Sequence, residues 1–263
     1  MKTKRLVFLA GLVFLACRMM AQESTSAHII GIGNTNILDT YLSQEKYKGA
    51  GLTYLYIRER VKPEKHWSNV IEHELDISHA DDRSSTTSEL EASYNLYWGR
   101  YRSWRLFDDR LRLQAGGLVN GTLGFIYQMS NSNNPAQGRL GIDISASAGG
   151  SYRFKIRKLP VQVTYQADLP LMGCMFSPQF GQSYYDISQG SRNHNVCFSH
   201  PGNALCFRQL LTFDLEFNRA SLRFGYMGDI RQSHVNSIRM HDLNHSFMIG
   251  YVRYLKVIKR NER

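Results

Sequence analysis

The residues best suited to chemistry lie in the last third of the chain. Serine, histidine and aspartate occur there close together, as Ser199, His200, Asp229, His241, Asp242 and His245. An imidazole can take a proton from a hydroxyl group or from water, and a carboxylate can orient the imidazole. In such a hydrolytic site His200 or His241 would be the base and Ser199 the nucleophile. Histidines are also common polar residues of loops, so residue type alone does not establish a site.

Charged residues form a second group, spread over four segments of the chain. Two segments are acidic, with Glu72, Glu74, Asp76, Glu89 and Glu91. Two later segments carry Arg208, Arg223 and Arg231 beside Asp214, Glu216 and Asp229. If these segments enclose a narrow space, the opposite charges will pair, and arginines will meet the acidic residues across it. This predicts a charge-paired interior, with a small selective pore as the alternative.

The segments that carry these residues alternate apolar and polar side chains. Leu90, Ala92, Tyr94, Leu96 and Trp98 alternate with Glu89, Glu91, Ser93 and Asn95. The same period of two runs through residues 207–217, 222–231 and 246–252. A period of two over about eight to eleven residues is typical of a β-strand long enough to cross a membrane.

This alternation places ten strands along the chain. They lie near residues 26–35, 48–60, 67–80, 87–99, 109–127, 138–156, 160–174, 204–217, 220–232 and 243–257. Short connections at 61–65, 99–108, 157–159 and 218–219 alternate with longer polar ones at 36–47, 81–86, 128–137, 175–203 and 233–242. Short turns at one end and long loops at the other are typical of outer-membrane barrels. We therefore expect the short turns in the periplasm and the long loops outside the cell.

Two fold classes fit the alternation. A soluble β-sandwich has strands of about 5–6 residues and buries its inner face in a dry core. Such a core would not accept Glu72, Glu74 and Asp76 on one strand, whereas a hydrated or ion-paired lumen would. The sequence therefore predicts an all-β fold, a transmembrane antiparallel up-and-down β-barrel of about ten strands, or alternatively about twelve.

The N-terminus has the pattern of a secretory signal peptide. A basic start precedes the apolar run at residues 6–17, and the small residue Ala21 is followed by polar residues. We expect cleavage after Ala21, so that residues 1–21 are the signal peptide and residues 22–263 a single barrel domain. Lipidation of Cys17 is the alternative.

The residues that remain after cleavage limit the ligands and partners. Loss of four basic residues lowers the formal charge from +10 to +6, and such weak, scattered basicity argues against nucleic acid. Cys174, Cys197 and Cys206 remain, so at most one disulfide bond can form within the chain, and its pairing stays open. Their spacing matches no zinc site, and we expect neither a metal nor a cofactor.

Two stretches resemble a known family. The first is Leu-Asp-Thr-Tyr-Leu-Ser at residues 38–43, followed by Tyr47 and Gly49, and the second runs through residues 222–232, 235–236, His241, His245 and 247–250. They are similar to the N-terminal signature and the closing hairpin of a Bacteroidota family of outer-membrane β-barrels of unknown function. The resemblance implies a barrel in the bacterial outer membrane and assigns no activity. The chain departs from the usual ending of such barrels, because it continues past Tyr254 into basic residues.

Two classes of function remain. The favoured one is a non-enzymatic outer-membrane protein, serving as a structural element, a narrow channel or a surface-binding protein. The alternative is a lipid or peptide hydrolase at the extracellular rim, because outer-membrane phospholipases and omptin proteases use similar residue types there. The ordered motif of neither enzyme family is present. We expect outer-membrane lipid and lipopolysaccharide around the barrel and the barrel-assembly machinery as partner during biogenesis, and the sequence favours no oligomeric state.

Overall fold

The computed structural model describes residues 23–62, 66–131, 134–191, 194–217 and 220–256. The expected signal peptide, its cleavage after Ala21 and the turns at 63–65 and 218–219 lie outside these residues. The strands are β1 (Glu23–Asp39), β2 (Tyr47–Lys62), β3 (Trp67–Asp81), β4 (Ser88–Leu106), β5 (Leu111–Gln128), β6 (Ala136–Ile156), β7 (Leu159–Phe176), β8 (Val196–Ser199), β9 (Cys206–Glu216), β10 (Ala220–Val235) and β11 (Ile238–Lys256). One short helix, α2, covers Tyr184–Ser188.

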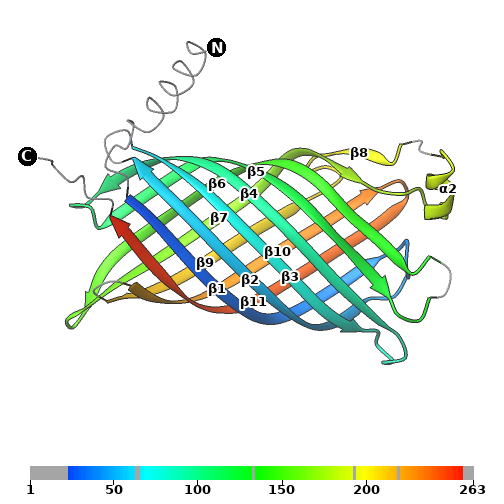
Figure 1. Ribbon diagram of the computed structural model, residues 1–263, viewed down its shortest axis with the longest axis horizontal. Coiled ribbons are helices and arrows are strands. Elements are labelled where there is room, and N and C mark those ends of the chain that lie inside the picture. Colours follow the sequence, from blue (N-terminus) through cyan, green and yellow to red (C-terminus); the bar gives the residue numbers. More distant parts are fainter. Residues whose placement is uncertain (1–22, 63–65, 132–133, 192–193, 218–219, 257–263) are drawn as a thin grey trace, which may run out of the picture.

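The long strands close into a ring. β1 pairs antiparallel with β2 on one side and with β11, the last strand, on the other. Around the ring the order is β1-β2-β3-β4-β5-β6-β7-β9-β10-β11, so neighbours along the chain are neighbours in space. The short strand β8 pairs with the end of β7. The fold is therefore a closed ten-stranded antiparallel β-barrel, which confirms the predicted fold class (Figure 1).

The barrel has two unlike ends. At the terminal end, Glu23 of β1 lies opposite Lys256 of β11, and short turns at 107–110 and 157–158 join neighbouring strands. At the loop end, longer connections span 40–46, 82–87, 129–135 and 177–205. The last of these contains α2 and β8, which lie together at this end in Figure 1.

One predicted loop is wrong. The sequence predicts a long polar loop at 233–242, but β10 and β11 continue through most of it. Asn236 and Ser237 are the whole connection, and their φ angles of 52° and 62° are both positive, as a two-residue type I′ hairpin turn requires. The two strands pair here although their side chains are polar, because the hydrogen bonds between strands are made by main-chain groups. His241 and Asp242 therefore lie within a strand.

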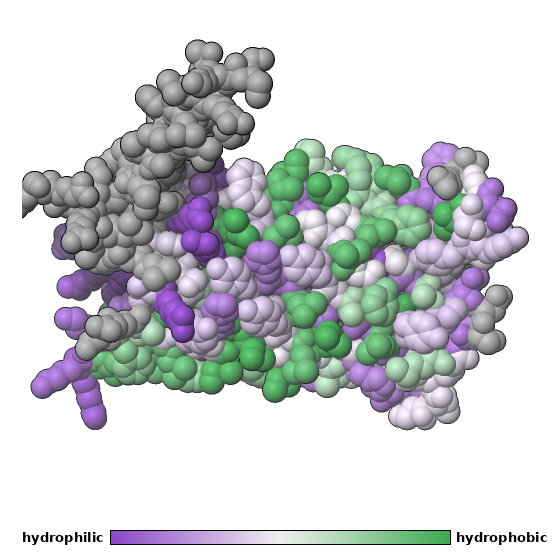
Figure 2. Space-filling view, viewed as in Figure 1, coloured by the Kyte–Doolittle hydropathy of each residue, from purple (hydrophilic) through white to green (hydrophobic). Residues whose placement is uncertain are grey.

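Alternate residues of each strand face opposite sides of the wall. Large apolar side chains are exposed on the outside, among them Ile30, Leu75, Trp98, Leu123 and Phe213. The inside carries fully buried polar residues such as Glu72, Glu74, Glu89 and Asn95. Figure 2 shows apolar residues along the wall and hydrophilic ones gathered toward the ends. An apolar outside around a polar inside is the arrangement of membrane-crossing barrels.

Within the described part of the chain, no helix combines the length and the hydrophobicity that crossing a membrane would need.

Buried apolar side chains form three clusters inside the barrel. In its terminal half one apolar cluster consists of Ala27, Ile29, Leu55, Leu210, Met227, Met248 and Val252. A second consists of Val70, Tyr97, Tyr101 and Leu118, and Ile57 packs against both. A third cluster, which includes Ile37 and Tyr47, lies at the loop end. A ten-stranded barrel is narrow enough to be filled in this way.

Closure of the ring predicts a particular behaviour on electrophoresis. The β1–β11 pairing joins the first strand to the last, so neither terminal strand offers detergent a free edge at which to open the barrel. We expect the unheated protein to migrate faster in SDS gels than the boiled protein. Identical mobility of the two samples would contradict a closed barrel.

The two faces of β9 provide a test of the register. Leu211 lies on the outer face and Thr212, with 2% of its surface exposed, faces the lumen. In lipid vesicles Leu211→Arg should lower the free energy of unfolding by roughly 2–4 kcal/mol, because it places a charge in the apolar wall. Thr212→Arg should cost less, and urea titrations measure both. Equal losses would show that the register is wrong.

Candidate functional site

An arginine at the centre of the lumen contacts three carboxylates. Arg208 of β9 forms ion pairs with Glu72 at 2.7 Å, with Glu74 at 2.9 Å and with Asp168 at 2.9 Å. Its guanidinium also lies 4.5 Å from the centre of the Tyr97 ring, a distance at which a cation is attracted to an aromatic face. Each of the three guanidinium nitrogens therefore donates to a different carboxylate.

These contacts join opposite walls of the barrel. Glu72 and Glu74 belong to β3, and β3 and β9 are five strands apart in either direction around the ring of ten. Asp168 belongs to β7, which pairs directly with β9. The ion pairs of Arg208 with Glu72 and Glu74 thus join β9 to the opposite wall across the lumen.

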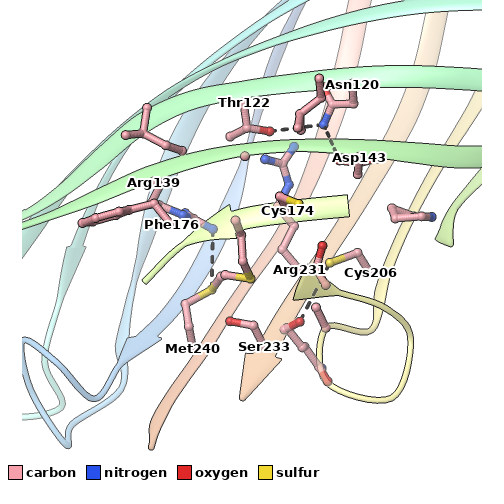
Figure 3. Close-up of a pocket in the computed structure, with 18 of the residues that line it drawn as sticks. Asn120, Thr122, Arg139, Asp143, Cys174, Phe176, Cys206, Arg231, Ser233 and Met240 are labelled. Atoms are coloured by element: carbon pink, nitrogen blue, oxygen red, sulfur yellow. Dashed lines mark hydrogen bonds between the residues drawn. The ribbon is translucent and has the colours of Figure 1, made fainter. Parts of the chain in front are cut away.

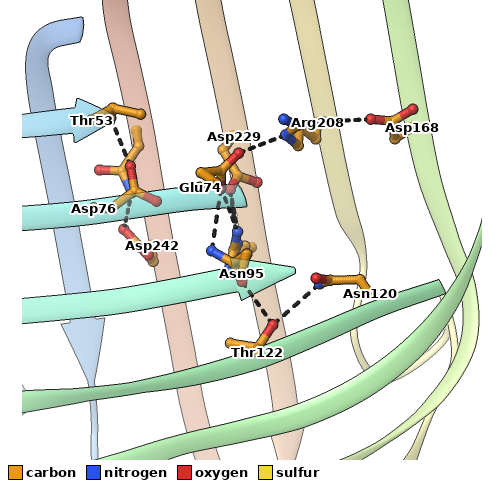
Figure 4. Close-up of polar contacts among 12 residues, drawn as sticks. Thr53, Glu74, Asp76, Asn95, Asn120, Thr122, Asp168, Arg208, Asp229 and Asp242 are labelled. Carbon is orange, nitrogen blue, oxygen red and sulfur yellow. Dashed lines mark hydrogen bonds and ion pairs between the residues drawn. The ribbon is translucent and has the colours of Figure 1, made fainter. Parts of the chain in front are cut away.

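Arg231 of β10 makes a second crossing just beside the first. It pairs with Asp229 at 2.6 Å and with Glu74 at 3.3 Å, and it donates to Asn95 Oδ1 at 3.0 Å. Asn95 lies on β4, opposite β10 in the ring. Figure 4 shows Glu74 between Arg208 and Asn95, with Asp168 beyond Arg208. We call Arg208, Arg231 and their partners the central ion-pair layer.

A third arginine forms ion pairs within the lumen nearer the loop end. Arg139 of β6 pairs with Glu91 of β4 and, at 2.9 Å, with Asp242 of β11. Arg139 and Asp168 were not among the residues singled out from the sequence. In β6 the inward-facing residues have odd numbers, as do Arg139 and Asp143. In this part of β7 they have even numbers, as do Asp168 and Gln166. This alternation could have identified both residues from the sequence.

The remaining predicted lumen residues have partners outside the central ion-pair layer. Arg223 was expected to reach the acidic strands, and this is wrong: it pairs with Asp214 of the neighbouring strand at 2.6 Å, because the two residues lie opposite each other in the β9–β10 register. Glu216 lies 3.6 Å from Arg153. Asp76 accepts a hydrogen bond from Thr53 at 2.7 Å.

Glu89 is the most isolated carboxylate of the lumen. Its side chain is fully buried, and neither carboxylate oxygen has a hydrogen-bond partner among the residues described. It lies on β4 near the loop end, as does Glu91.

The structure does not bring the hydrolase candidates together. His200 accepts a hydrogen bond at Nδ1 from the Gly202 amide, and Ser199 ends β8. His245 lies on the outer face, 2.6 Å from the Tyr226 hydroxyl, whereas His241 lies 3.4 Å from Asn36 Oδ1. Asp229 and Asp242 are held in the ion pairs described above. In the described ranges no hydrogen bond joins any of these histidines to Ser199 or to either aspartate.

The cysteines and possible metal ligands form no site of their own. Cys174, Cys197 and Cys206 are all free thiols. The part of the chain that the structure describes contains no group of three or more His, Cys, Asp or Glu residues arranged to hold a metal ion.

A cavity of about 150 Å³ lies between the central ion-pair layer and the loop end. Polar residues of its lining include Asn120, Asp143 and Arg231, and apolar ones include Met172 and Phe207. Figure 3 shows Asn120 and Asp143 on one side of this cavity and Cys206 and Ser233 on the other. We call it the loop-end cavity.

The connection between β7 and β8 is attached to the barrel at the loop end, and its Ser177 lines the cavity. Tyr184 of α2 accepts a hydrogen bond from the Gly138 amide at 2.6 Å and donates one to Gln137 at 2.9 Å. Burial raises the pKa of Tyr184 above its ordinary value, so the phenol stays a donor. Ser183 donates to Asp186, which lowers the pKa of that carboxyl and fixes the first turn of α2.

Solved barrels are similar to this chain at low sequence identity. The transport unit of the autotransporter AIDA-I from Escherichia coli is 9% identical, with a TM-score of 0.48 over 93% of this chain and 92% of that chain. The translocator domain of the autotransporter NalP from Neisseria meningitidis is 12% identical, with a TM-score of 0.41 over 96% and 97%. An outer membrane channel from Pseudomonas putida is 10% identical, with a TM-score of 0.37 over 89% and 95%. At these identities the likeness concerns the fold alone.

No match was found among proteins with curated descriptions. A family model matches nearly the whole chain, residues 15–262, and its description assigns no function. The chain therefore belongs to the family described as "Protein of unknown function (DUF3316)".

Proposed function

We propose that this protein is an outer-membrane barrel whose lumen is closed by ion pairs and whose role is to bind a small molecule on the extracellular side. The observation that carries the proposal is Arg208, which joins β9 to the opposite strand β3 at 2.7 and 2.9 Å. A lumen crossed by such contacts leaves no open pore at that level. The protein is a surface-binding barrel in this proposal, and not a porin.

The outer surface supports this location. An apolar wall around a polar lumen is the arrangement of outer-membrane barrels, and the sequence motifs resemble those of Bacteroidota outer-membrane barrels. The loop end faces the outside of the cell, since long loops are extracellular in such barrels. Outer-membrane lipid and lipopolysaccharide then surround the wall, and the barrel-assembly machinery inserts it.

The binding site is the loop-end cavity. It lies on the loop side of the central ion-pair layer, while the terminal half of the lumen is packed with apolar side chains. A small molecule can thus be held from the extracellular side without a path to the periplasm. The separation of the hydrolase candidates gives no support to a second, enzymatic proposal.

The proposed location has a direct test. The mature protein should fractionate with outer membranes, require detergent for extraction and begin at Gln22, because residues 1–21 have the pattern of a signal peptide. Cell fractionation and N-terminal sequencing measure both. Recovery in the soluble periplasmic fraction would refute the membrane location.

The closed lumen predicts low conductance. Wild-type protein in planar lipid bilayers should pass little current. Arg208→Ala should destabilise the barrel by roughly 3–5 kcal/mol, because it leaves three carboxylates buried without their cation. Arg208→Met combined with Glu72→Gln and Glu74→Gln removes most of that unpaired charge and should restore most of the lost stability, while conductance stays low because apolar clusters still occupy the terminal half.

Arg223→Ala is the matched control for this experiment. It breaks an ion pair with a single carboxylate on the adjacent strand, so it should lower the free energy of unfolding by less than Arg208→Ala and leave conductance low. Large, steady currents through the wild-type protein would refute the closed lumen and favour a porin.

A further inference from the structure

The barrel wall is interrupted beside the loop-end cavity. β7 pairs with β9 as far as Asp168↔Arg208, and it pairs with β8 from Gly173 onward. For the intervening residues 169–172, the described chain shows no ladder pair with β8 or β9. Pro170 lies in this stretch and has no N–H to contribute to a ladder. We call this gap, between residues 169–172 and 200–207, the β7–β9 seam.

The other edge of β7 is irregular at the same place. Ser145 of β6 pairs with Pro170 while Ile144 pairs with Met172, so Leu171 is an extra residue in β7. This is a β-bulge, which bends a strand and redirects its side chains. Leu171 and Met172 are both exposed on the outer surface as a result.

The chain on the far side of the seam is attached elsewhere. At residues 200–205 it makes a turn, in which the His200 carbonyl accepts from the amides of Asn203 and Ala204 at 3.0 and 2.8 Å. The Asn203 carbonyl then accepts from the His234 amide of β10 at 2.8 Å. The turn is thus bound to β10 and leaves the edge of β7 at residues 169–172 uncovered.

The loop-end cavity extends through this interrupted wall. Its lining includes Arg208 and Asp143 on the lumen side and Ile142, Leu171 and Met172 on the outer side. These three apolar residues are 57%, 42% and 51% exposed, and Val196 and Phe198 of β8 continue the apolar surface beyond them. The seam therefore connects the cavity with the part of the wall that faces lipid.

The inner end of the cavity offers unused hydrogen-bond acceptors. Asn120, with 6% of its surface exposed, donates through Nδ2 to Asp143 at 3.1 Å and to Thr122 at 3.2 Å. The carboxylate of Asp143 fixes this orientation, because it can only accept. Asn120 Oδ1 then has no partner within the described residues.

The charges around this inner end favour a cationic head group. Asp143 accepts from Ser145 at 2.8 Å but has no ion pair in the described chain. The arginines of the cavity lining, Arg139, Arg208 and Arg231, are each already paired with two or more carboxylates. A ligand with hydrogen-bond donors and a positive charge would satisfy both Asn120 Oδ1 and Asp143.

We propose that the loop-end cavity binds an amphipathic amine, which enters from the outer leaflet through the β7–β9 seam. Its ammonium head meets Asn120 and Asp143, and its apolar chain lies between Leu171 or Met172 and Phe207. The inference rests on the proposed function, because it uses the same cavity and requires the barrel to be in a membrane.

Cys206 lines the cavity and is a free thiol, so it can report occupancy. In vesicles, with Cys174 and Cys197 changed to serine, dodecylammonium should slow maleimide alkylation of Cys206 by at least about tenfold. Dodecanoate at the same concentration should not protect. Asp143→Asn should abolish the protection, while Glu89→Gln, which removes a carboxylate outside the cavity, should retain it.

A second measurement tests the route. Alkylation of Cys206 by dodecylmaleimide dissolved in the bilayer should slow by about tenfold after Met172→Trp, which fills the seam. Leu123→Trp, an equally outward position on β5, should leave the rate unchanged. An unchanged rate in Met172→Trp would refute the lateral route.

The outcomes separate this inference from the proposed function. Low conductance with no protection by dodecylammonium, or equal protection by dodecanoate, would refute the amine site alone. Large wild-type conductance would refute the closed lumen itself.

Discussion

The lumen of this barrel depends on one buried arginine. Moving a guanidinium out of water costs several kcal/mol unless carboxylates surround it at hydrogen-bond distance. Arg208 meets that condition only because Glu72, Glu74 and Asp168 reach it from β3 and β7. A shift of one residue in any of these strands would turn the ion-pairing side chain of that strand to the outer face. The ion pairs therefore fix the register of three strands at once.

The number of strands determines whether this contact across the lumen can form. The diameter of a barrel grows with its strand number, and a single arginine side chain can join opposite walls only when the barrel is narrow. Ten strands place β3 directly across from β9. The same narrowness lets Ile57 pack against apolar clusters on both sides of the terminal half. The contacts across the lumen thus depend on the size of the ring as well as on its charges.

The sequence predicted the faces of the strands better than their partners. Period-two alternation is local, so it placed Glu72, Glu74 and Arg208 in the lumen. It contains no information about height along the barrel axis, which the stagger of the strands determines. Arg223 was therefore assigned to the acidic strands, although its register partner Asp214 lies on the adjacent one.

Errors about the candidate hydrolytic site have a related cause. Because residues 233–242 were predicted to be a loop, the alternation of inward and outward side chains was not applied to them. Within β11, His245 and Asp242 are three residues apart and must point to opposite faces, as their exposed and buried side chains show. Only a loop could have brought them together, and the type I′ turn at Asn236 leaves none.

The β7–β9 seam could not be read from the sequence, because it is a gap between two segments and only Pro170 marks it locally. Its position beside the central ion-pair layer has a physical consequence. The last ladder pair before the gap is Asp168↔Arg208, and the same two residues form an ion pair at 2.9 Å. That contact joins β7 to β9 at the last ladder pair before the seam. The central ion-pair layer therefore lies directly beside the interruption in the ladder.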